Sequence, residues 1–393
     1  MPGPSSHPLH PPPRTRPTFD LPHFDPTRQQ HQSPDYLEDG ELMKLLKALP
    51  GHKAMGTHGI AYEALKLGRK GVEDILSYIF NHCLRLRLHT DLFKETITMV
   101  IRKGRKDADI PTSYRALAIL NPIAKLFERI LADRLKALVI SHNLLPAAQY
   151  GAPGRSTTLA VEHLLNTVYR GWVCKMKVSI LGLDLSGAYD HVDRAKLLKV
   201  LAARGIPDWL IETIWSFLSD RRTFIHMPGF EGDEYWIDVG IPQGSPLSPL
   251  LFLFYAAPIL EQFNLDDDVC ITMFSYVDDT YILVRSCRYT INTGWMKKVH
   301  DKLFEWAAAN NLHFSPGKYH VMHFVNSSAK DPQDEVCNEI PDLPAFRNIK
   351  TKKELDDLLP KTMVILGVTF DKSLTWVPHI EEVSVYLSAF LMR

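Results

Sequence analysis

The stretch "FSYVDDT", residues Phe274 to Thr280, places two adjacent carboxylates between two apolar segments. Apolar and aromatic residues lead into the pair, and "YILV" follows it directly. Adjacent carboxylates repel each other, and their removal from water is costly unless positive charge lies beside them. The pattern predicts two strands joined by a tight turn at Asp278 and Asp279, with the pair either facing water or holding a cation.

A second predicted strand also ends in a carboxylate. In "ILGLDLSGAYDHVD", Asp184 follows an apolar run that is typical of a buried strand. If that strand lies beside the hairpin, Asp184 and Asp278 converge at one edge of a sheet. Three carboxylates there suit a pair of divalent cations about 3.5–4 Å apart, which can clamp the attacking and leaving oxygens of an in-line phosphoryl displacement. Mg²⁺ is the expected ion, because it binds a few carboxylates together with waters and phosphates.

Other acidic runs in the chain have an ordinary explanation. Asp266–Asp268 and the pair Asp356 and Asp357 lie in polar or charged settings, where solvation accounts for them. The pair at 278–279 differs, because strand-forming apolar residues bracket it on both sides. That context favours a metal-binding interpretation over a solvated turn.

The composition is that of a globular protein with several packed parts. The 393 residues are 45% hydrophobic and carry zero net formal charge, so any basic surface for nucleic acid must be local. The five cysteines include no C-x-x-C pair, which favours reduced intracellular thiols over a disulfide frame or a zinc site. No apolar run is long enough to cross a membrane, so no membrane partner is expected.

The chain is expected to divide into a tail and a mixed α+β region. Residues 1–36 contain ten of the 27 prolines, which predicts a disordered Pro-rich tail. From Asp39 onward helices and strands are interspersed without strict βαβ alternation, which indicates an antiparallel sheet. Asn121 and Pro122 mark the start of a well-defined amphipathic helix. Residues 326–361 form a polar, charge-mixed insertion.

Several stretches, taken in chain order, carry a family resemblance. They are "LPGHKAMGTHGI", "SYRALAILNPIAKLFERILADRL", "QYGAPGRSTTLAV", "LDLSGAYDHVDR", "GIPQGSPLSPLLFLFY", "YVDD", "NNLHFSPGKYHVMHF" and "LGVTFDKSLTWVPHI". Together they resemble the reverse transcriptases of non-LTR (LINE-type) retrotransposons over roughly residues 40 to 390. The departures from the family pattern fall in the N-terminal part of the resemblance. His58 replaces an acid, Ala116 replaces a proline, and the "RKGRKD" loop and the "QYGAPGRST" stretch are each one residue shorter than usual.

The resemblance implies a right-hand polymerase fold, with fingers and a palm that contains an antiparallel sheet. The fingers-like region is expected at 37–175, and a reverse transcriptase domain at 83–370 with its palm at about 176–325. Residues 362–393 would form the junction between palm and thumb, with the thumb truncated. The implied activity is RNA-directed DNA polymerisation, in which a primer 3′-OH attacks the α-phosphate of a deoxynucleoside triphosphate.

The resemblance also assigns roles to catalytic residues. Asp184, Asp278 and Asp279 would ligate two Mg²⁺ ions, with Mn²⁺ as an alternative, and Asp278 would be a more direct ligand than Asp279. Lys318, in "SPGKYH", lies where the family has a lysine proposed to protonate the leaving pyrophosphate. An ordinary surface lysine is the competing interpretation.

Five further residues are expected to contact the nucleotide. Lys103 and Arg115 match positions in the fingers that would hold the triphosphate. Tyr189 matches the bulky side chain that excludes a ribose 2′-OH, with packing in the core as its alternative. Gln243 and Gly244 would lie against the incoming nucleotide and the template, because glycine allows close approach of the backbone.

Three alternatives remain open at this level. A catalytically inactive nucleic-acid-binding relic of such an element would keep the palm but add no nucleotides. A viral RNA-dependent RNA polymerase is disfavoured by Tyr189 and "PQGSP", and a group II intron maturase by "GRST" and "FDKSLTWVPH". The expected partners are an RNA template, a DNA primer and deoxynucleoside triphosphates. No protein partner is inferred, and a nuclear location is suggested by the resemblance alone.

Overall fold

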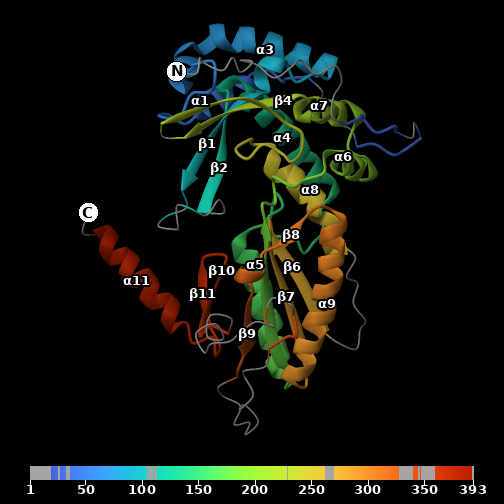
Figure 1. The fold of residues 1–393 in the computed structure, drawn as a ribbon, viewed down its shortest axis with the longest axis vertical. Helices are drawn as coiled ribbons and strands as arrows, with labels where there is room; N and C mark the ends of the chain where they lie inside the picture. The colour runs from blue at the N-terminus through green and yellow to red at the C-terminus, as the bar shows by residue number, and fades with distance from the viewer. Residues whose placement is uncertain are drawn as a thin grey trace, which may run out of the picture. The chain divides into compact units, whose positions relative to one another are not determined.

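The computed structural model describes residues 19–24, 27–31, 36–102, 104, 109, 113–227, 229–261, 270–326, 340–343, 346 and 359–391 (Figure 1). The chain divides into two compact units. Unit 1 comprises Met1–Leu144 and Tyr189–Tyr255, and unit 2 comprises Leu145–Ala188 and Ala256–Arg393. No helix among the described residues is both long enough and apolar enough to cross a bilayer.

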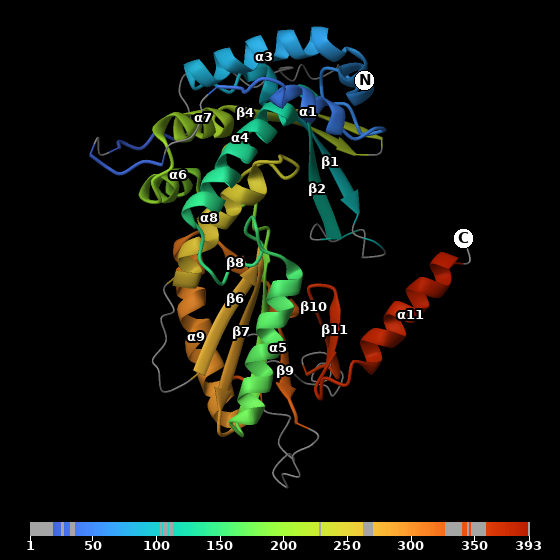
Figure 2. The ribbon, with the colours of Figure 1, turned by 180° about the vertical axis from the view of Figure 1, so that it is seen from behind.

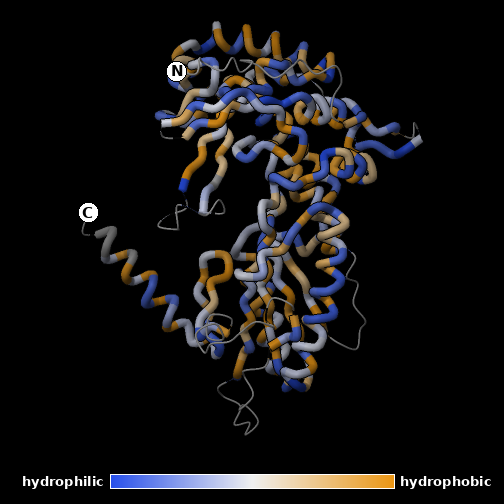
Figure 3. The backbone as a smooth tube through the Cα atoms, in the orientation of Figure 1, coloured by the Kyte–Doolittle hydropathy of each residue, from blue (hydrophilic) through white to orange (hydrophobic). Residues whose placement is uncertain are grey.

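Unit 1 is built mainly from helices. They are α1 (Glu41–Ala48), α2 (Tyr62–Leu67), α3 (Arg69–Leu86), η1 (Asp91–Phe93), α4 (Pro122–His142), α6 (Arg194–Ala203), α7 (Asp208–Leu218) and α8 (Ser248–Glu261), of which α8 continues past Tyr255. Hydrophobic and hydrophilic residues alternate along α3, as expected for an amphipathic helix (Figure 3). The predicted start of α4 is confirmed, because the backbone N–H of Ile123 donates to Asn121 Oδ1 at 2.9 Å.

Unit 1 also contains a four-stranded sheet in the order β2-β1-β4-β5. The strands are β1 (Glu95–Arg102), β2 (Tyr114–Leu120), β4 (Arg221–Met227) and β5 (Phe230–Ile237). β1 pairs with β2 in antiparallel and with β4 in parallel orientation. Residues 221–237 were expected in the palm at 176–325, yet their pairing with β1 places them in unit 1. The reason is a parallel pairing between distant segments, which local sequence does not reveal.

The described residues 19–24 and 27–31, which fall in the predicted disordered tail at 1–36, belong to unit 1 and include contacts with its helices, while most of that tail lies outside the described residues. Arg28 donates to the backbone carbonyls of Ala202 and Ile206, each at 3.0 Å, and forms an ion pair with Asp208. The backbone N–H of His31 donates to Gly205 O at 2.8 Å. Carbonyls at the C-terminal end of α6 have no partners within the helix, so a guanidinium can anchor an otherwise irregular segment there.

Unit 2 is organised around an antiparallel sheet of five strands, β3 (Lys177–Ser186), β6 (Cys270–Tyr276), β7 (Asp279–Ser286), β8 (His313–Phe314) and β9 (His320–Phe324). β7 lies between β6 and β3, and β8 and β9 pair with β3 on its other side. All of these pairings are antiparallel, as predicted for the palm.

Helices cover both faces of this sheet. In Figure 2, α5 (Thr157–Val173) lies in front of the strands, and it shares a core with Val178, Ile180 and the hairpin of β10 (Thr362–Ile365) and β11 (Val368–Asp371). α9 (Tyr289–Ala309) packs against β3 and β7, and its Asn292 donates to Ser179 Oγ at 2.9 Å. Because adjacent strand residues face opposite sides, Ser179 and Ile180 place α9 and α5 on opposite faces.

The remaining elements of unit 2 follow the sheet in sequence. The short helix η3 (Pro316–Lys318) connects β8 to β9, and α11 (Val377–Leu391) follows β11. Residues 145–175, expected with the fingers, belong to unit 2, because α5 packs on its sheet. Most of the predicted insertion at 326–361 lies outside the described residues.

Candidate active site

Two of the predicted site carboxylates face each other across neighbouring strands. Asp184 near the end of β3 is the register partner of Asp279 at the start of β7. Side chains of directly opposed residues in an antiparallel pair point to the same face. Asp184 lies an even number of positions after Val178 and Ile180 along β3, so its side chain points to the same face of the sheet, which is the face that α5 covers. The third carboxylate, Asp278, lies in the turn immediately before Asp279.

The turn between β6 and β7 has an unusual backbone. Tyr276 pairs with Asp279, so Val277 and Asp278 alone form the loop. Val277 has φ of 59°, a left-handed conformation that a β-branched residue adopts rarely and at a cost. Two-residue hairpin loops require positive φ at one or both positions, and glycine or asparagine normally occupies them.

Gln149 holds this turn in place. Its Oε1 accepts hydrogen bonds from the backbone N–H groups of Val277 and Gly151, each at 3.0 Å. Its Nε2 donates to Val277 O at 3.4 Å, and the side chain is 1% exposed. Backbone bonds between residues 148–150 and Ser275 join the same segment to β6. The turn that presents Asp278 is therefore fixed by a segment more than a hundred residues earlier in the chain.

The electrostatics of the carboxylate cluster (Asp184, Asp278 and Asp279) favour an added positive charge. Burial raises the pKa of Asp278, and the charge of Asp184 adds to this effect. Burial, together with the charges of Asp278 and Asp184, raises the pKa of Asp279 to about 6. The same burial and carboxylate charges raise the pKa of Tyr281, whose side chain follows Asp279 on the same face. The positive charge of the protein near these carboxylates is thus too small to offset the cost of burying them in the ionised form.

Lys318 supplies the neighbouring positive charge. Its Nζ lies 2.6 Å from Asp184 Oδ2 in an ion pair, and the lysine side chain is 61% exposed. The charge of Lys318 also lowers the pKa of Asp278 and Asp279, although less than burial raises it. The backbone N–H of Ser315 donates to Asp184 O at 2.8 Å, which fixes η3 beside the end of β3.

The cluster has the donor chemistry of a site for a hard divalent cation. It offers carboxylate oxygens alone. Burial and, to a smaller extent, the charges of neighbouring carboxylates raise the pKa values of Asp278 and Asp279, and a cation would offset both effects. Within the described ranges, however, no group of three His, Cys, Asp or Glu side chains is gathered in a metal-binding arrangement. The side chains of the cluster are therefore of the kind that binds a hard divalent cation. In this conformation Asp184 is paired with Lys318.

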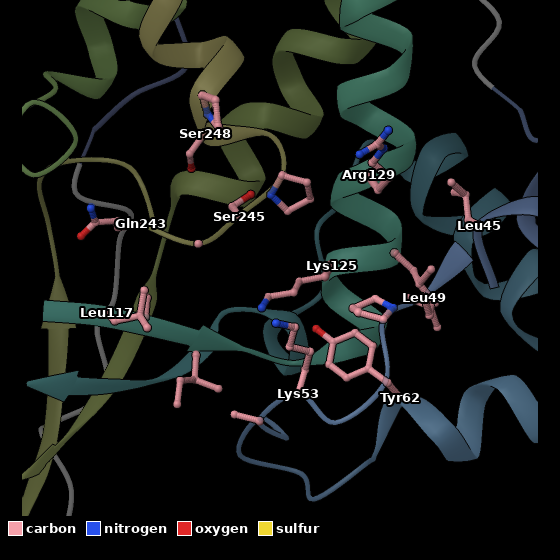
Figure 4. Close-up of a pocket in the computed structure, with 18 of the residues that line it drawn as sticks. Leu45, Leu49, Lys53, Tyr62, Leu117, Lys125, Arg129, Gln243, Ser245 and Ser248 are labelled. Carbon is pink, nitrogen blue, oxygen red and sulfur yellow. The ribbon is translucent and has the colours of Figure 1, made fainter. Parts of the chain in front are cut away.

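Three of the residues predicted to contact a nucleotide line one pocket of unit 1. Tyr189, Gln243 and Gly244 border a cavity of about 770 Å³, called here the unit 1 pocket (Figure 4). Its wall also includes Lys53, Tyr62, Lys125, Arg129, Ser245, Ser248 and the apolar residues Leu45, Leu49, Pro50, Leu117 and Pro246. The sequence prediction did not include Lys53 or Lys125.

The backbone around Gly244 is closely packed. Gly244 has φ of 122°, and a Cβ there would lie 2.7 Å from Ala118 O. Gln243 O accepts a hydrogen bond from Ala118 N at 3.3 Å, so this loop is joined to β2. Tyr189 stacks on Phe252, with ring centroids 5.3 Å apart. The tyrosine is thus packed on Phe252 and also borders the pocket, and its role beside a ribose stays a prediction.

The other two predicted nucleotide contacts are described less fully. Arg115 lies in β2, where its backbone pairs with Ile101, and its side chain is outside the described structure. Lys103 lies outside the described residues.

Gln149 is a site residue that sequence reasoning missed. It belongs to the stretch "QYGAPGRST", which was used only to recognise the family. The sequence carried no signal for this role beyond the place of Gln149 in that stretch, because its burial, and with it the need of its amide for hydrogen-bond partners, is known only from the structure. Which backbone it serves depends on the pairing of residues 148–150 with β6.

Comparison with known proteins adds an independent line of evidence. Residues 101–370 match the family described as "Reverse transcriptase (RNA-dependent DNA polymerase)". A curated relative, the probable RNA-directed DNA polymerase from transposon BS of Drosophila melanogaster, is 25% identical over 347 residues. The RNA-directed DNA polymerase from mobile element jockey of the same species is 25% identical over 351 residues. Each match covers 87% of this chain and 36% of the relative.

The chain therefore spans little more than a third of the length of these curated relatives. Among solved structures, it is similar to a telomerase from Candida tropicalis in complex with a fragment of telomeric RNA. That similarity has a TM-score of 0.48 at 11% identity and covers 77% of this chain and 48% of the telomerase chain.

Proposed function

Because this chain belongs to the reverse transcriptase family, we propose that it is an RNA-directed DNA polymerase of a LINE-type element. The substrates would be a DNA primer, an RNA template and deoxynucleoside triphosphates. The observation that carries the proposal is the meeting of Asp184 and Asp279 as register partners, with Asp278 in the adjoining turn. Three carboxylates at one end of a buried sheet are what metal-assisted nucleotidyl transfer requires.

The carboxylate cluster would hold divalent cations, with Mg²⁺ as the ion of choice. Members of the reverse transcriptase family generally use divalent metal ions, and Mg²⁺ favours carboxylate and phosphate oxygens. When bound, such ions stabilise the charge on the attacking and leaving oxygens of an in-line phosphoryl displacement. Asp278 and Asp279 would be ionised for this purpose, because a nearby cation lowers the pKa that burial raises.

The protein's own residues would orient the reactants. Asp184 and Asp279 lie at fixed positions on adjacent strands, so their spacing is set by the sheet rather than by flexible loops. Gln149 fixes the turn that carries Asp278. Such positioning contributes to rate because the reacting groups need no reorganisation at the moment of transfer.

Lys318 would act at the leaving group. Its ammonium lies beside Asp184 and is largely exposed, so it can exchange this partner for a phosphate oxygen of the substrate. It would then donate a proton to the departing pyrophosphate. The neighbouring carboxylates would keep the lysine close to the site before substrate binds.

The unit 1 pocket would hold parts of the nucleotide and template. Tyr189 would lie against the sugar, where a ring leaves space for hydrogen but not for a 2′-hydroxyl. Gln243 and Gly244 would contact the base pair, because the exposed Gly244 has no side chain to block a close approach. Lys103 and Arg115 would bind the triphosphate by charge and by bidentate hydrogen bonds.

Primer extension tests this proposal directly. The full chain is incubated with a DNA primer on an RNA template, each deoxynucleoside triphosphate, and Mg²⁺ or Mn²⁺. Extension is expected, and Asp278→Asn should reduce its rate by about 100-fold or more, because it removes a charge needed in the transition state. Asp301→Asn is the matched control, since Asp301 lies on α9 and forms its ion pair with Lys297.

The competing reading is an inactive relic that binds nucleic acid. If the wild-type chain binds template and primer yet extends nothing with either metal ion, the polymerase proposal fails and the relic reading stands. Extension that persists unchanged in Asp278→Asn would instead remove the carboxylate cluster from the mechanism.

A further inference from the structure

We propose that Lys53 and Lys125 form a phosphate-binding subsite in the unit 1 pocket, which receives the phosphate of a nucleotide unit. The inference relies on the proposed function only for the identity of the ligand as a nucleotide. Two sources share this chemistry, a phosphate within a single strand of nucleic acid and the phosphate chain of a free nucleoside triphosphate.

The two lysines come from different elements and meet inside the pocket. Lys53 lies in the loop after α1, and Lys125 projects from the first turns of α4. Figure 4 shows their amino groups and the hydroxyl of Tyr62 pointing toward one another across the cavity. Arg129 also lines the pocket, but its ion pair with Asp133 is on the exposed side of α4. Two ammonium groups and a hydroxyl thus converge on one space.

The arrangement lacks a negative partner within the described residues. Neither lysine forms an ion pair there, although most other charged side chains near α4 do. Burial lowers the pKa of Lys125, and the charge of Lys53 lowers it further. Glu128 opposes this effect, but its carboxylate is fully buried and lies 3.5 Å from His89 Nε2. Two like charges held together in a partly buried place are favoured when an anion binds between them.

The loop that carries Lys53 is held against the start of α4. A Cβ at Gly56 would lie 2.7 Å from Asn121 Cα and 2.8 Å from Asn121 N, so only glycine fits this approach. Asn121 in turn caps α4, four residues before Lys125. The backbone segments that carry the two lysines are therefore held together before any ligand arrives, which reduces the entropy cost of binding.

The rest of the pocket suits a sugar or base rather than an inorganic ion alone. Its wall is mostly apolar, and its cavity of about 770 Å³ is far larger than a phosphate group needs. Leu49, Pro50 and Leu117 offer flat or branched apolar surface, while Ser245 and Ser248 add hydroxyl groups. A nucleotide matches both features, because its phosphate is anionic and its base has flat faces that can lie on apolar side chains. Lys53 also belongs to the stretch "KAMGTHGI", for which the proposed catalytic mechanism assigns no role.

Binding measurements on the full chain test the subsite without any need for catalysis. One arm measures the fluorescence anisotropy of a labelled single-stranded RNA oligonucleotide over a range of salt concentrations. The other measures the binding of dATP by calorimetry. The variants are Lys53→Gln, Lys125→Gln and the double variant, and Lys125→Arg retains the charge.

If the phosphate belongs to a strand, the double variant should weaken RNA binding about tenfold or more at low salt. The slope of log Kd against log salt should become shallower by about 0.7 for each lysine removed. Lys125→Arg should retain most of the affinity. Lys136→Gln is the matched control, because it removes the same charge from an exposed position on α4 outside the pocket, and it should leave both readouts nearly unchanged.

If instead dATP binding weakens while RNA binding is unchanged, the subsite receives the free nucleotide. Equal effects of Lys136→Gln and Lys125→Gln, or no effect of the double variant in either arm, would overturn the inference. Lys53 is exposed, so Lys53→Gln keeps the test informative even if Lys125→Gln reduces folding. The extension assay with Asp278→Asn tests the polymerase proposal, and the binding assays with the lysine variants test the subsite. Either proposal can therefore fail while the other stands.

Discussion

The side-chain amide of Gln149 hydrogen-bonds both backbone polar groups of Val277: its Oε1 accepts from Val277 N at 3.0 Å, and its Nε2 donates to Val277 O at 3.4 Å. Val277 has φ of 59°, and strain of this kind costs on the order of 1–3 kcal/mol. The buried amide offsets that cost with hydrogen bonds to backbone groups that would otherwise lack partners. The position of Asp278 thus depends on a side chain from a segment 128 residues before Val277 in the sequence.

The first prediction concerns this amide. Gln149→Met keeps the length of the side chain but leaves the N–H groups of Val277 and Gly151 without their acceptor, at a cost of about 1–3 kcal/mol. We expect the extension rate to fall at least tenfold while the KM for deoxynucleotide changes little, because the turn that we propose to hold metal moves and the unit 1 pocket does not. Single-turnover primer extension with varied deoxynucleotide measures both quantities.

A second substitution separates positioning from simple destabilisation. Glycine adopts positive φ freely, so Val277→Gly should relieve the strain that Gln149 offsets. Adding Val277→Gly to Gln149→Met should then restore part of the extension rate. If the double variant recovers no extension, and if Gln149→Met lowers thermal stability without weakening Mn²⁺ binding, Gln149 only stabilises the core and does not position the turn.

The second prediction tests how closely the same two segments must approach. A Cβ at Gly151 would lie 2.8 Å from both Val277 N and Val277 Cγ2, so Gly151→Ala must displace the turn. Extension should fall by at least tenfold, and RNA binding measured by anisotropy should persist. Gly294→Ala is the control within unit 2, because a Cβ there meets nothing within 4 Å and α9 should gain up to about 1 kcal/mol. Equal extension by both variants would contradict the close contact.

The third prediction concerns the ion pair of Lys318 and Asp184. Its effect on stability should be small, below about 1 kcal/mol, because the lysine is 61% exposed. Its effect on cation binding should be larger, because Lys318→Met removes a positive charge beside the carboxylate cluster. We expect tighter Mn²⁺ binding by electron paramagnetic resonance in Lys318→Met and weaker binding in Asp278→Asn.

Lys302→Met, on the exposed side of α9, is the charge-matched control and should bind Mn²⁺ like the wild type. Slower extension despite tighter Mn²⁺ binding in Lys318→Met would agree with a role for Lys318 at the leaving group. Weaker Mn²⁺ binding in that variant would contradict the competition between lysine and metal.

The fourth prediction is a pH dependence of the stability of unit 1. His89 is fully buried, and burial lowers the pKa of its imidazole to about 4, although the carboxylate of Glu128 opposes the shift. Between pH values of about 6.5 and 4 the unfolded chain therefore binds a proton that the folded chain does not. Stability is retained above this window and lost as the pH falls through it, by about 2 kcal/mol at pH 5.

Urea unfolding at pH 7 and pH 5 measures this loss. His89→Gln removes the titrating ring, so its stability should fall less between the two pH values than that of the wild type, whatever its stability at pH 7. An equal loss in both proteins would show that other groups carry the pH dependence.

Much of the fold class followed from local patterns. The family match confirms the predicted reverse transcriptase family and its right-hand polymerase fold class. The antiparallel sheet of unit 2 and the helix that starts at Asn121 are also as predicted. Alternating apolar residues and a capping side chain are local signals, so one sequence suffices to interpret them.

The division of the chain was harder to predict. The expected boundary between fingers and palm near residue 175 does not match the two units, because α5 packs on the sheet of unit 2 and β4 pairs with β1 in unit 1. Both contacts join segments that are distant in sequence. Apolar patterning and β-propensity predict that a segment forms a strand, but they do not predict which other strand it pairs with.

The sequence by itself predicted which residues would carry the chemistry, namely three carboxylates at two strand ends and a lysine after β8. The prediction was possible because two carboxylates that are buried among apolar residues are costly unless a positive charge lies beside them. Only the tertiary structure decided that Asp184 opposes Asp279, that Gln149 holds Val277, and that Lys53 meets Lys125. Each of these relationships depends on strand register or on the docking of distant segments, which are set by the packing of the whole unit rather than by any local stretch.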